Sequence, residues 1–96
     1  MAESSEHSSI LPRLEGLTEI LADVEHERWS HWQRYLHSMC ERNSDGSLVI
    51  PVNLVKKWEL QMNTPYSELS ESEKESDREQ VRLYLPIIAD ALKPDL

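Results

Sequence analysis

Apolar residues recur every three or four positions along much of the chain, which is the spacing of one face of an α-helix. The first stripe begins after Ile10 to Pro12 and contains Leu14, Leu17, Leu21 and Val24. A second stripe, offset from the first, contains Glu25, Trp29, Trp32, Leu36 and Met39 or Cys40. The offset predicts one long helix, or two helices with a bend at residues 23–25.

Turn-forming residues interrupt this pattern at residues 43–47, where an Asp-Gly pair is a strong turn signal. Residues 48–50 follow as a short apolar run that is rich in β-branched side chains, which predicts a brief extended segment. Pro51 or Asn53 can open the next helix, as a first-turn proline or as an N-cap. Its apolar face contains Leu54, Val55, Trp58 and Met62, and it should end by residues 63–65.

The final helix is predicted to begin near Glu71, because Ser70-x-x-Glu73 has the capping-box spacing that satisfies free amides at a helix start. Its apolar stripe contains Val81, Tyr84 or Leu85, Ile88 and Leu92. Pro86 lacks an amide hydrogen and clashes with the preceding turn, so we expect a kink or a break at that position.

These elements together predict a mainly α fold, a compact bundle of about four helices with at most one short extended segment. Residues 1–9 are rich in Ser and Glu and have no apolar periodicity, so we interpret them as a disordered leader. Residues 10–96 then form a single domain, because a chain of 96 residues is near the usual size of one domain.

Charge and composition narrow the classes of partner. The chain has 18 acidic and 10 basic residues and a net charge of −8, which repels nucleic-acid backbones and anionic membranes. No run approaches the ~18 apolar residues that a membrane span requires. The hydrophobic fraction of 39% supports only a modest core, so forming a homodimer would add stability. We expect no direct nucleic-acid binding and no membrane contact.

The chemistry-bearing residues favour binding over catalysis. Cys40 is the only cysteine, which suits a reducing compartment, and we predict a cytoplasmic protein. His26 and His31 lie about 140° apart around a helix, so they are poorly placed to share a metal ion. His37 and Cys40 can be neighbours, but no third catalytic partner accompanies them. With no phosphate-binding glycine loop either, we predict no catalytic residues, no metal and no cofactor.

The densest polar and aromatic run, residues 25–35, allows two interpretations. The favoured one places Trp29 and Trp32 in the core, with the charged residues between them in solvent. The other is a recognition patch around His26 and Trp29.

Two spaced motifs resemble a known family. Residues 65–78 read P-Y-x-x-L-x-x-x-E-K-x-x-D-R, which resembles the signature of the RyR domain, a repeat named for ryanodine receptors and also found in bacterial and phage proteins. Residues 24–29 read V-E-H-E-R-W and resemble the first-helix V-H-x-x-W motif of that family, with Glu25 as an additional residue. Residues 39–43 replace the G-W-x-Y-G-like turn of the family. The resemblance covers about residues 13–92.

The resemblance implies a compact helical binding module without enzymatic activity. In the receptors this domain is a cytoplasmic accessory unit, and in prokaryotes it resembles a ligand-sensing part of conflict systems that recognises nucleotide-derived signals. A small nucleotide-like ligand or a protein is therefore the expected partner. Carried over by position, the candidate binding residues are His26, Trp29, Tyr66, Glu73, Lys74, Asp77 and Arg78.

Two roles are open for these residues. The aromatic members can stack on a flat ring while Lys74 or Arg78 meets a phosphate. Alternatively, Asp77 and Arg78 hold the last helix against the first through hydrogen bonds to His26, and we favour this interpretation. A different functional hypothesis is an acidic adaptor or inhibitor whose negative face binds a basic protein partner.

Overall fold

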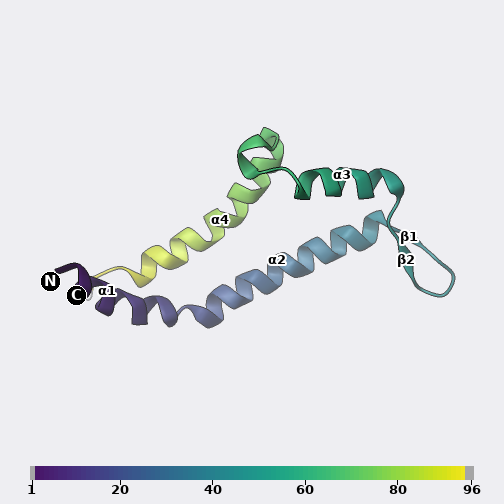
Figure 1. The fold of residues 1–96 in the computed structure, drawn as a ribbon. Coiled ribbons are helices and arrows are strands. Elements are labelled where there is room, and N and C mark those ends of the chain that lie inside the picture. Colours follow the sequence, from purple (N-terminus) through teal and green to yellow (C-terminus); the bar gives the residue numbers. More distant parts are fainter. Residues whose placement is uncertain (1, 95–96) are drawn as a thin grey trace. The chain divides into compact units, whose positions relative to one another are not determined.

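The computed structural model describes residues 2–94, with side chains from Ser9 onward, and is mainly helical (Figure 1). The elements of this part are α1 (Ala2–Glu15), α2 (Thr18–Met39), β1 (Glu41–Arg42), β2 (Leu48–Val49), α3 (Val52–Met62), the 3-10 helix η1 (Tyr66–Glu68) and α4 (Glu71–Ala91). The predicted mainly α fold class, with about four helices, is confirmed.

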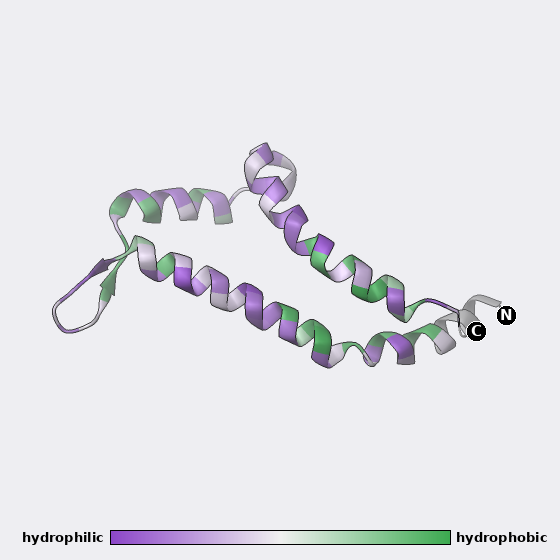
Figure 2. Cartoon of the chain, turned by 180° about the vertical axis from the view of Figure 1, so that it is seen from behind, coloured by the Kyte–Doolittle hydropathy of each residue, from purple (hydrophilic) through white to green (hydrophobic). Residues whose placement is uncertain are grey.

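Contacts divide the chain into two compact units. The first unit contains the residues up to Arg28 and those from Asp77 onward, and so includes α1, the first half of α2 and most of α4. The second unit, residues 29–76, contains the rest of α2, the β1–β2 hairpin, α3, η1 and the start of α4. Hydrophobic and hydrophilic positions are interspersed along the helices of both units (Figure 2).

Helices α1 and α2 are separated at Gly16, whereas no helix ends at residues 23–25, the position of the bend in the two-helix alternative. Glycine in a helix interior costs roughly 1 kcal/mol relative to alanine, which favours an interruption at this position. The Thr18 hydroxyl donates a hydrogen bond to the Glu15 carbonyl oxygen at 2.6 Å, so a side chain satisfies a backbone acceptor beside the break. Helix α2 is continuous from Thr18 to Met39, which agrees with the long-helix alternative of the prediction over these residues.

Helix α1 begins at Ala2 and overlaps residues 1–9, which the sequence analysis assigns to a disordered leader. In the first unit, Arg13 Nη1 donates a hydrogen bond to the Lys93 carbonyl oxygen at 2.8 Å, which connects α1 to the segment that follows α4. The division into a leader and a single domain over residues 10–96 stays a prediction.

Helix α4 begins at Glu71, as predicted, and continues through Pro86 to Ala91, so the expected break does not occur. Gln80 and Tyr84 are one turn apart on this helix. The Gln80 Oε1 and the Tyr84 hydroxyl are both buried without a hydrogen-bond partner. Each unpaired buried polar atom of this kind costs about 1–3 kcal/mol.

The segment between α2 and α3 is a small antiparallel hairpin, in which Glu41 pairs with Val49 and Arg42 with Leu48. Strand β2 coincides with the predicted extended segment. Its partner β1 was missed, because two charged residues do not give the alternating pattern of a strand. Gly46, in the turn, has φ 91°, a left-handed conformation that favours glycine.

Side-chain hydrogen bonds close this turn. The Ser47 hydroxyl and the Ser47 amide donate to Asp45 Oδ1 at 2.6 and 2.9 Å. Because both bonds favour the ionised carboxylate, they lower the pKa of Asp45 from its ordinary value of 3.8, the hydroxyl contributing more.

Packing in the second unit centres on α3. Leu54 is 7% exposed, and among residues 9–94 it is the one hydrophobic residue that is buried. Val55 and Trp58 follow it on the same side of α3 and are half-buried. The helices that the structure describes include none with the length and apolar character needed to cross a membrane.

Candidate functional site

The seven residues carried over from the RyR resemblance divide between the two units. Trp29, Tyr66, Glu73 and Lys74 belong to the second unit, whereas His26, Asp77 and Arg78 belong to the first.

Tyr66 opens the short helix η1 directly after Pro65. Proline has no amide hydrogen and fixes its own φ, here −60°, which suits the residue that precedes a helical turn. The Glu68 amide donates to the Pro65 carbonyl oxygen at 2.9 Å, and the Leu69 amide donates to the Tyr66 carbonyl oxygen at 3.1 Å. This tight turn presents the Tyr66 side chain at the surface, where it is 50% exposed.

Glu73 forms the predicted capping box at the start of α4. The Glu73 amide donates to Ser70 Oγ at 3.3 Å, and Glu73 Oε1 accepts from the Ser70 hydroxyl at 2.7 Å and from the Ser70 amide at 3.3 Å. These reciprocal bonds satisfy backbone groups that a helix start leaves open. The Glu73 carboxylate is thus engaged in local structure, which supports a structural role for this residue of the motif.

Lys74 lies over the Tyr66 ring. Its Nζ is 5.8 Å from the ring centroid and 3.7 Å from Glu71 Oε1. The Lys74 side chain is 18% exposed, so its long apolar stem is largely covered while the ammonium group faces the ring and the carboxylate. The motif therefore brings an exposed aromatic face and a cation together within one short segment.

The remaining four of the seven candidate residues lie on α2 and α4. Trp29 is 59% exposed. His26 and Asp77 are exposed, and Arg78 is half-buried. That Asp77 and Arg78 hold α4 against α2 through His26 stays a prediction.

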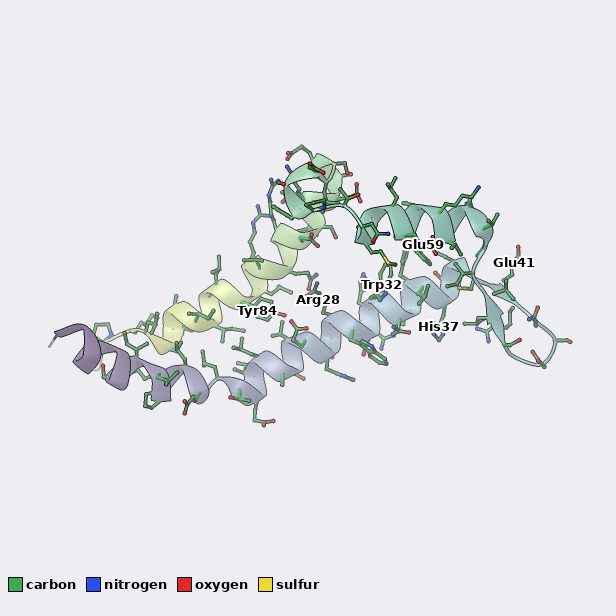
Figure 3. The ribbon with its side chains drawn as sticks, in the orientation of Figure 1. Arg28, Trp32, His37, Glu41, Glu59 and Tyr84 are labelled. Atoms are coloured by element: carbon green, nitrogen blue, oxygen red, sulfur yellow. The ribbon has the colours of Figure 1, made fainter. Side chains whose placement is uncertain are left out.

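A second cluster, which the sequence analysis did not identify as a site, lies between α2 and α3 in the second unit. Trp32 on α2, which is labelled in Figure 3, meets Trp58 on α3 in an edge-on contact, and the two ring centroids are 5.5 Å apart. Tyr35 also contacts Trp32, and the centroids of these two rings are 5.6 Å apart. Trp32, Trp58, Gln61 and Met62 line a hollow of about 280 Å³.

This cluster corrects the favoured interpretation of the tryptophans. Trp29 and Trp32 were predicted to be core residues, but they are 59% and 43% exposed. The half-buried positions on this part of α2 are instead Ser30, Gln33 and Leu36, and Cys40, directly after the helix, is also half-buried. The second apolar stripe is therefore turned partly to the surface. Periodicity alone could not reveal this, because it gives spacing and not the direction of the neighbouring helix.

His37 and Cys40, the residues considered for catalysis, lie at the end of α2 and directly after it. The contact between His37 and Cys40 is a backbone hydrogen bond, from the Cys40 amide to the His37 carbonyl oxygen at 3.3 Å. Cys40 is half-buried, and His37 is exposed. Over the residues with described side chains, no group of three or more His, Cys, Asp or Glu is arranged to hold a metal ion.

Comparison with known proteins gives no match to a family model, to a curated protein or to a solved structure.

Proposed function

We propose that this chain is a non-enzymatic binding module similar to the RyR domain, which recognises a small nucleotide-derived ligand or a protein partner. The observation that carries the proposal is the half-exposed Tyr66 ring with the Lys74 ammonium group 5.8 Å from its centroid. An aromatic face beside a cation suits a ligand that is both flat and anionic. The resemblance implies a role in bacterial or phage conflict.

In the nucleotide version, the base stacks on Tyr66 and a phosphate approaches Lys74. The first turn of α4 adds favourable potential, because the start of a helix carries partial positive charge. Glu71 opposes the phosphate, since its carboxylate already lies 3.7 Å from Lys74 Nζ. The phosphate must therefore replace Glu71 at the ammonium group, so the net affinity depends on the competition between two anions.

This competition makes the proposal testable with three variants in isothermal titration calorimetry against ATP and a cyclic NAD-derived nucleotide. Tyr66→Ala should abolish binding, because it removes the stacking surface. Glu71→Gln should tighten binding severalfold, because it removes the competing carboxylate and keeps the side-chain size. Ser67→Ala, on the exposed residue next to Tyr66, is the matched control and should bind as the wild type does.

No heat of binding with either nucleotide would reject the ligand version, as would equal affinities for the wild type and Tyr66→Ala. In the protein version, the same ring contacts a partner directly. A pull-down in which the wild-type chain retains a protein that Tyr66→Ala loses, and Ser67→Ala keeps, would then support the partner version.

One observation favours a second candidate function, an acidic adaptor or inhibitor that binds a basic protein. Residues 68–79 contain six acids and two bases, and Glu68 and Glu71, the acids of this stretch that are exposed in the second unit, provide a negative surface there. An electrostatic partner of this surface should be released as salt is raised, because ions screen exposed charges. Retention of the partner at high salt, together with its loss from Tyr66→Ala, would favour the aromatic site instead.

A further inference from the structure

The cluster between α2 and α3 continues into a larger apolar surface. Trp32, Tyr35 and Met39 recur at helical spacing along one side of α2 and are 43%, 41% and 39% exposed. Met62, at the end of α3, is 72% exposed and lines the hollow between the two tryptophans. We call the surface made by Trp32, Tyr35, Met39, Trp58, Gln61 and Met62 the aromatic face.

The aromatic face contains no ionisable acid or base apart from the tyrosine hydroxyl. This matters in a chain with a net charge of −8, because two copies repel each other wherever charged surfaces approach. A surface composed of aromatic side chains, methionines and one glutamine carries no such penalty. It also matches the composition of interface centres, which are enriched in Trp, Tyr and Met and depleted of charged residues.

The aromatic face holds both a protrusion and a recess. Met62 is 72% exposed and lines the hollow together with Trp32, Trp58 and Gln61. A methionine thioether adapts its shape readily and makes favourable contacts with aromatic ring edges. The hollow, at about 280 Å³, is below the usual size of a drug-sized ligand site and ample for one long side chain.

We propose that a second copy of this chain binds the aromatic face, with Met62 of each copy entering the hollow between Trp32 and Trp58 of the other. A two-fold axis beside Met62 relates the two copies. Protrusion and recess then meet twice, since a two-fold contact uses the same patch on both subunits. The proposal does not rest on the proposed function, because none of its residues belongs to the Tyr66–Lys74 segment.

The exposed area of these side chains indicates the size of the dimer contact. The exposed parts of Trp32, Tyr35, Met39 and Met62 provide on the order of 400 Å² of apolar surface per copy. Homodimer interfaces are about 65% apolar, so the full contact would bury roughly 1,200 Å² in total. This value is near the lower limit for a specific stable interface, so we expect a dimer that forms as the protein concentration rises.

Sedimentation equilibrium on the full chain, from low to high micromolar concentration, tests the proposal. The wild type should change from the 11.2 kDa chain mass to twice that mass. Met62→Glu should raise the dissociation constant of the dimer at least about tenfold, because it places a charge in an apolar recess. Leu60→Glu is a closely matched control, since Leu60 is also on α3, is also 72% exposed and does not line the hollow.

The proposal predicts that Leu60→Glu dimerises like the wild type. A chain that stays monomeric throughout the concentration range would overturn it. Equal weakening by both substitutions would also overturn it, because the effect would then follow from added negative charge and not from the hollow. Circular dichroism of both variants establishes that the helices are retained, so that loss of the dimer reports on the contact.

Oxidative cross-linking locates the contact independently. In a Cys40→Ser background, Met62→Cys places a single thiol beside the proposed two-fold axis, where two thiols can meet at disulfide distance. A covalent dimer should form rapidly on mild oxidation, and far more slowly with Leu60→Cys. The opposite order would place the dimer contact on the other side of α3 and would overturn the proposal.

Discussion

Two contacts in the second unit differ in how they are assembled. The Tyr66–Lys74 contact forms within one short motif, from a tight turn and the capped start of the helix that follows it. The Trp32–Trp58 contact joins two helices that a hairpin separates, so it exists only when the chain has folded back. Local contacts of the first kind survive small changes elsewhere, whereas the second kind depends on packing across the unit.

The strongest test of this difference is Leu54→Ala. Leu54 is 7% exposed on the side of α3 that includes Trp58, and truncation of a buried leucine costs about 2–5 kcal/mol. We expect a lower free energy of unfolding, measured by urea denaturation, and a change in tryptophan fluorescence as the Trp32–Trp58 contact loosens. Leu60→Ala, at a 72% exposed position of the same helix, should cost less than ~0.5 kcal/mol. Similar losses from the two substitutions would contradict the non-local character of the contact.

The next effect is expected at the capping box. Ser70→Ala removes the side-chain oxygen that accepts from the Glu73 amide, which costs roughly 1 kcal/mol for a typical N-cap. The loss should appear as a lower melting temperature. The fluorescence of the Trp32–Trp58 pair should remain native at low temperature, because the cap acts only on α4. A change in that fluorescence in the folded variant would show that the two regions are not separate.

A smaller effect is expected from the contact between Tyr66 and Lys74 itself. A cation over an aromatic ring contributes about 0.5–1 kcal/mol where the ring is at the surface, as Tyr66 is at 50% exposure. A double-mutant cycle with Tyr66→Leu and Lys74→Met should therefore give a small favourable coupling energy in thermal denaturation. Zero coupling would indicate that Lys74 is held by Glu71 and not by the ring.

The smallest expected effect is the pH response of the hairpin turn. Hydrogen bonds from Ser47 lower the pKa of Asp45 in the folded chain, so their contribution is present above the unfolded pKa, near 3.8. It is lost as the pH falls from about that value through the lower folded pKa. An NMR titration of the Ser47 amide should show a midpoint below 3.8, and Ser47→Ala should move the Asp45 midpoint towards that value. A wild-type midpoint at or above 3.8 would contradict the assignment.

The same difference between local and non-local contacts explains what the sequence could predict. Spacing and cap chemistry correctly predicted the helix start at Glu71, the capping box of Ser70 and Glu73, and helix α3 after Pro51. Each of these depends on residues within a few positions of one another, so the necessary information is local.

The errors fall where the outcome depends on distant residues or on weak local preferences. The apolar stripe of α2 predicted a buried Trp32, but the direction in which α3 packs leaves it 43% exposed. The helices separate at Gly16, a position that the stripe offset does not mark, because a single glycine is only a weak local signal for the end of a helix. Within the candidate site, the short motif that contains Tyr66 and Lys74 allowed their proximity to be predicted from the sequence. The hollow beside Trp32 could not be predicted, because residues of two helices line it.

The central claim is that residues 65–78 contain the ligand-contacting surface of a binding module, and NMR shift mapping tests it most directly. Amide spectra of the isotope-labelled chain would be recorded while ATP or the cyclic NAD-derived nucleotide is added. We predict saturable shifts concentrated at Tyr66 and Lys74, with the Trp32 and Trp58 signals unchanged. Shifts confined to the aromatic face, or no saturable shift with either nucleotide, would contradict this placement of the ligand site.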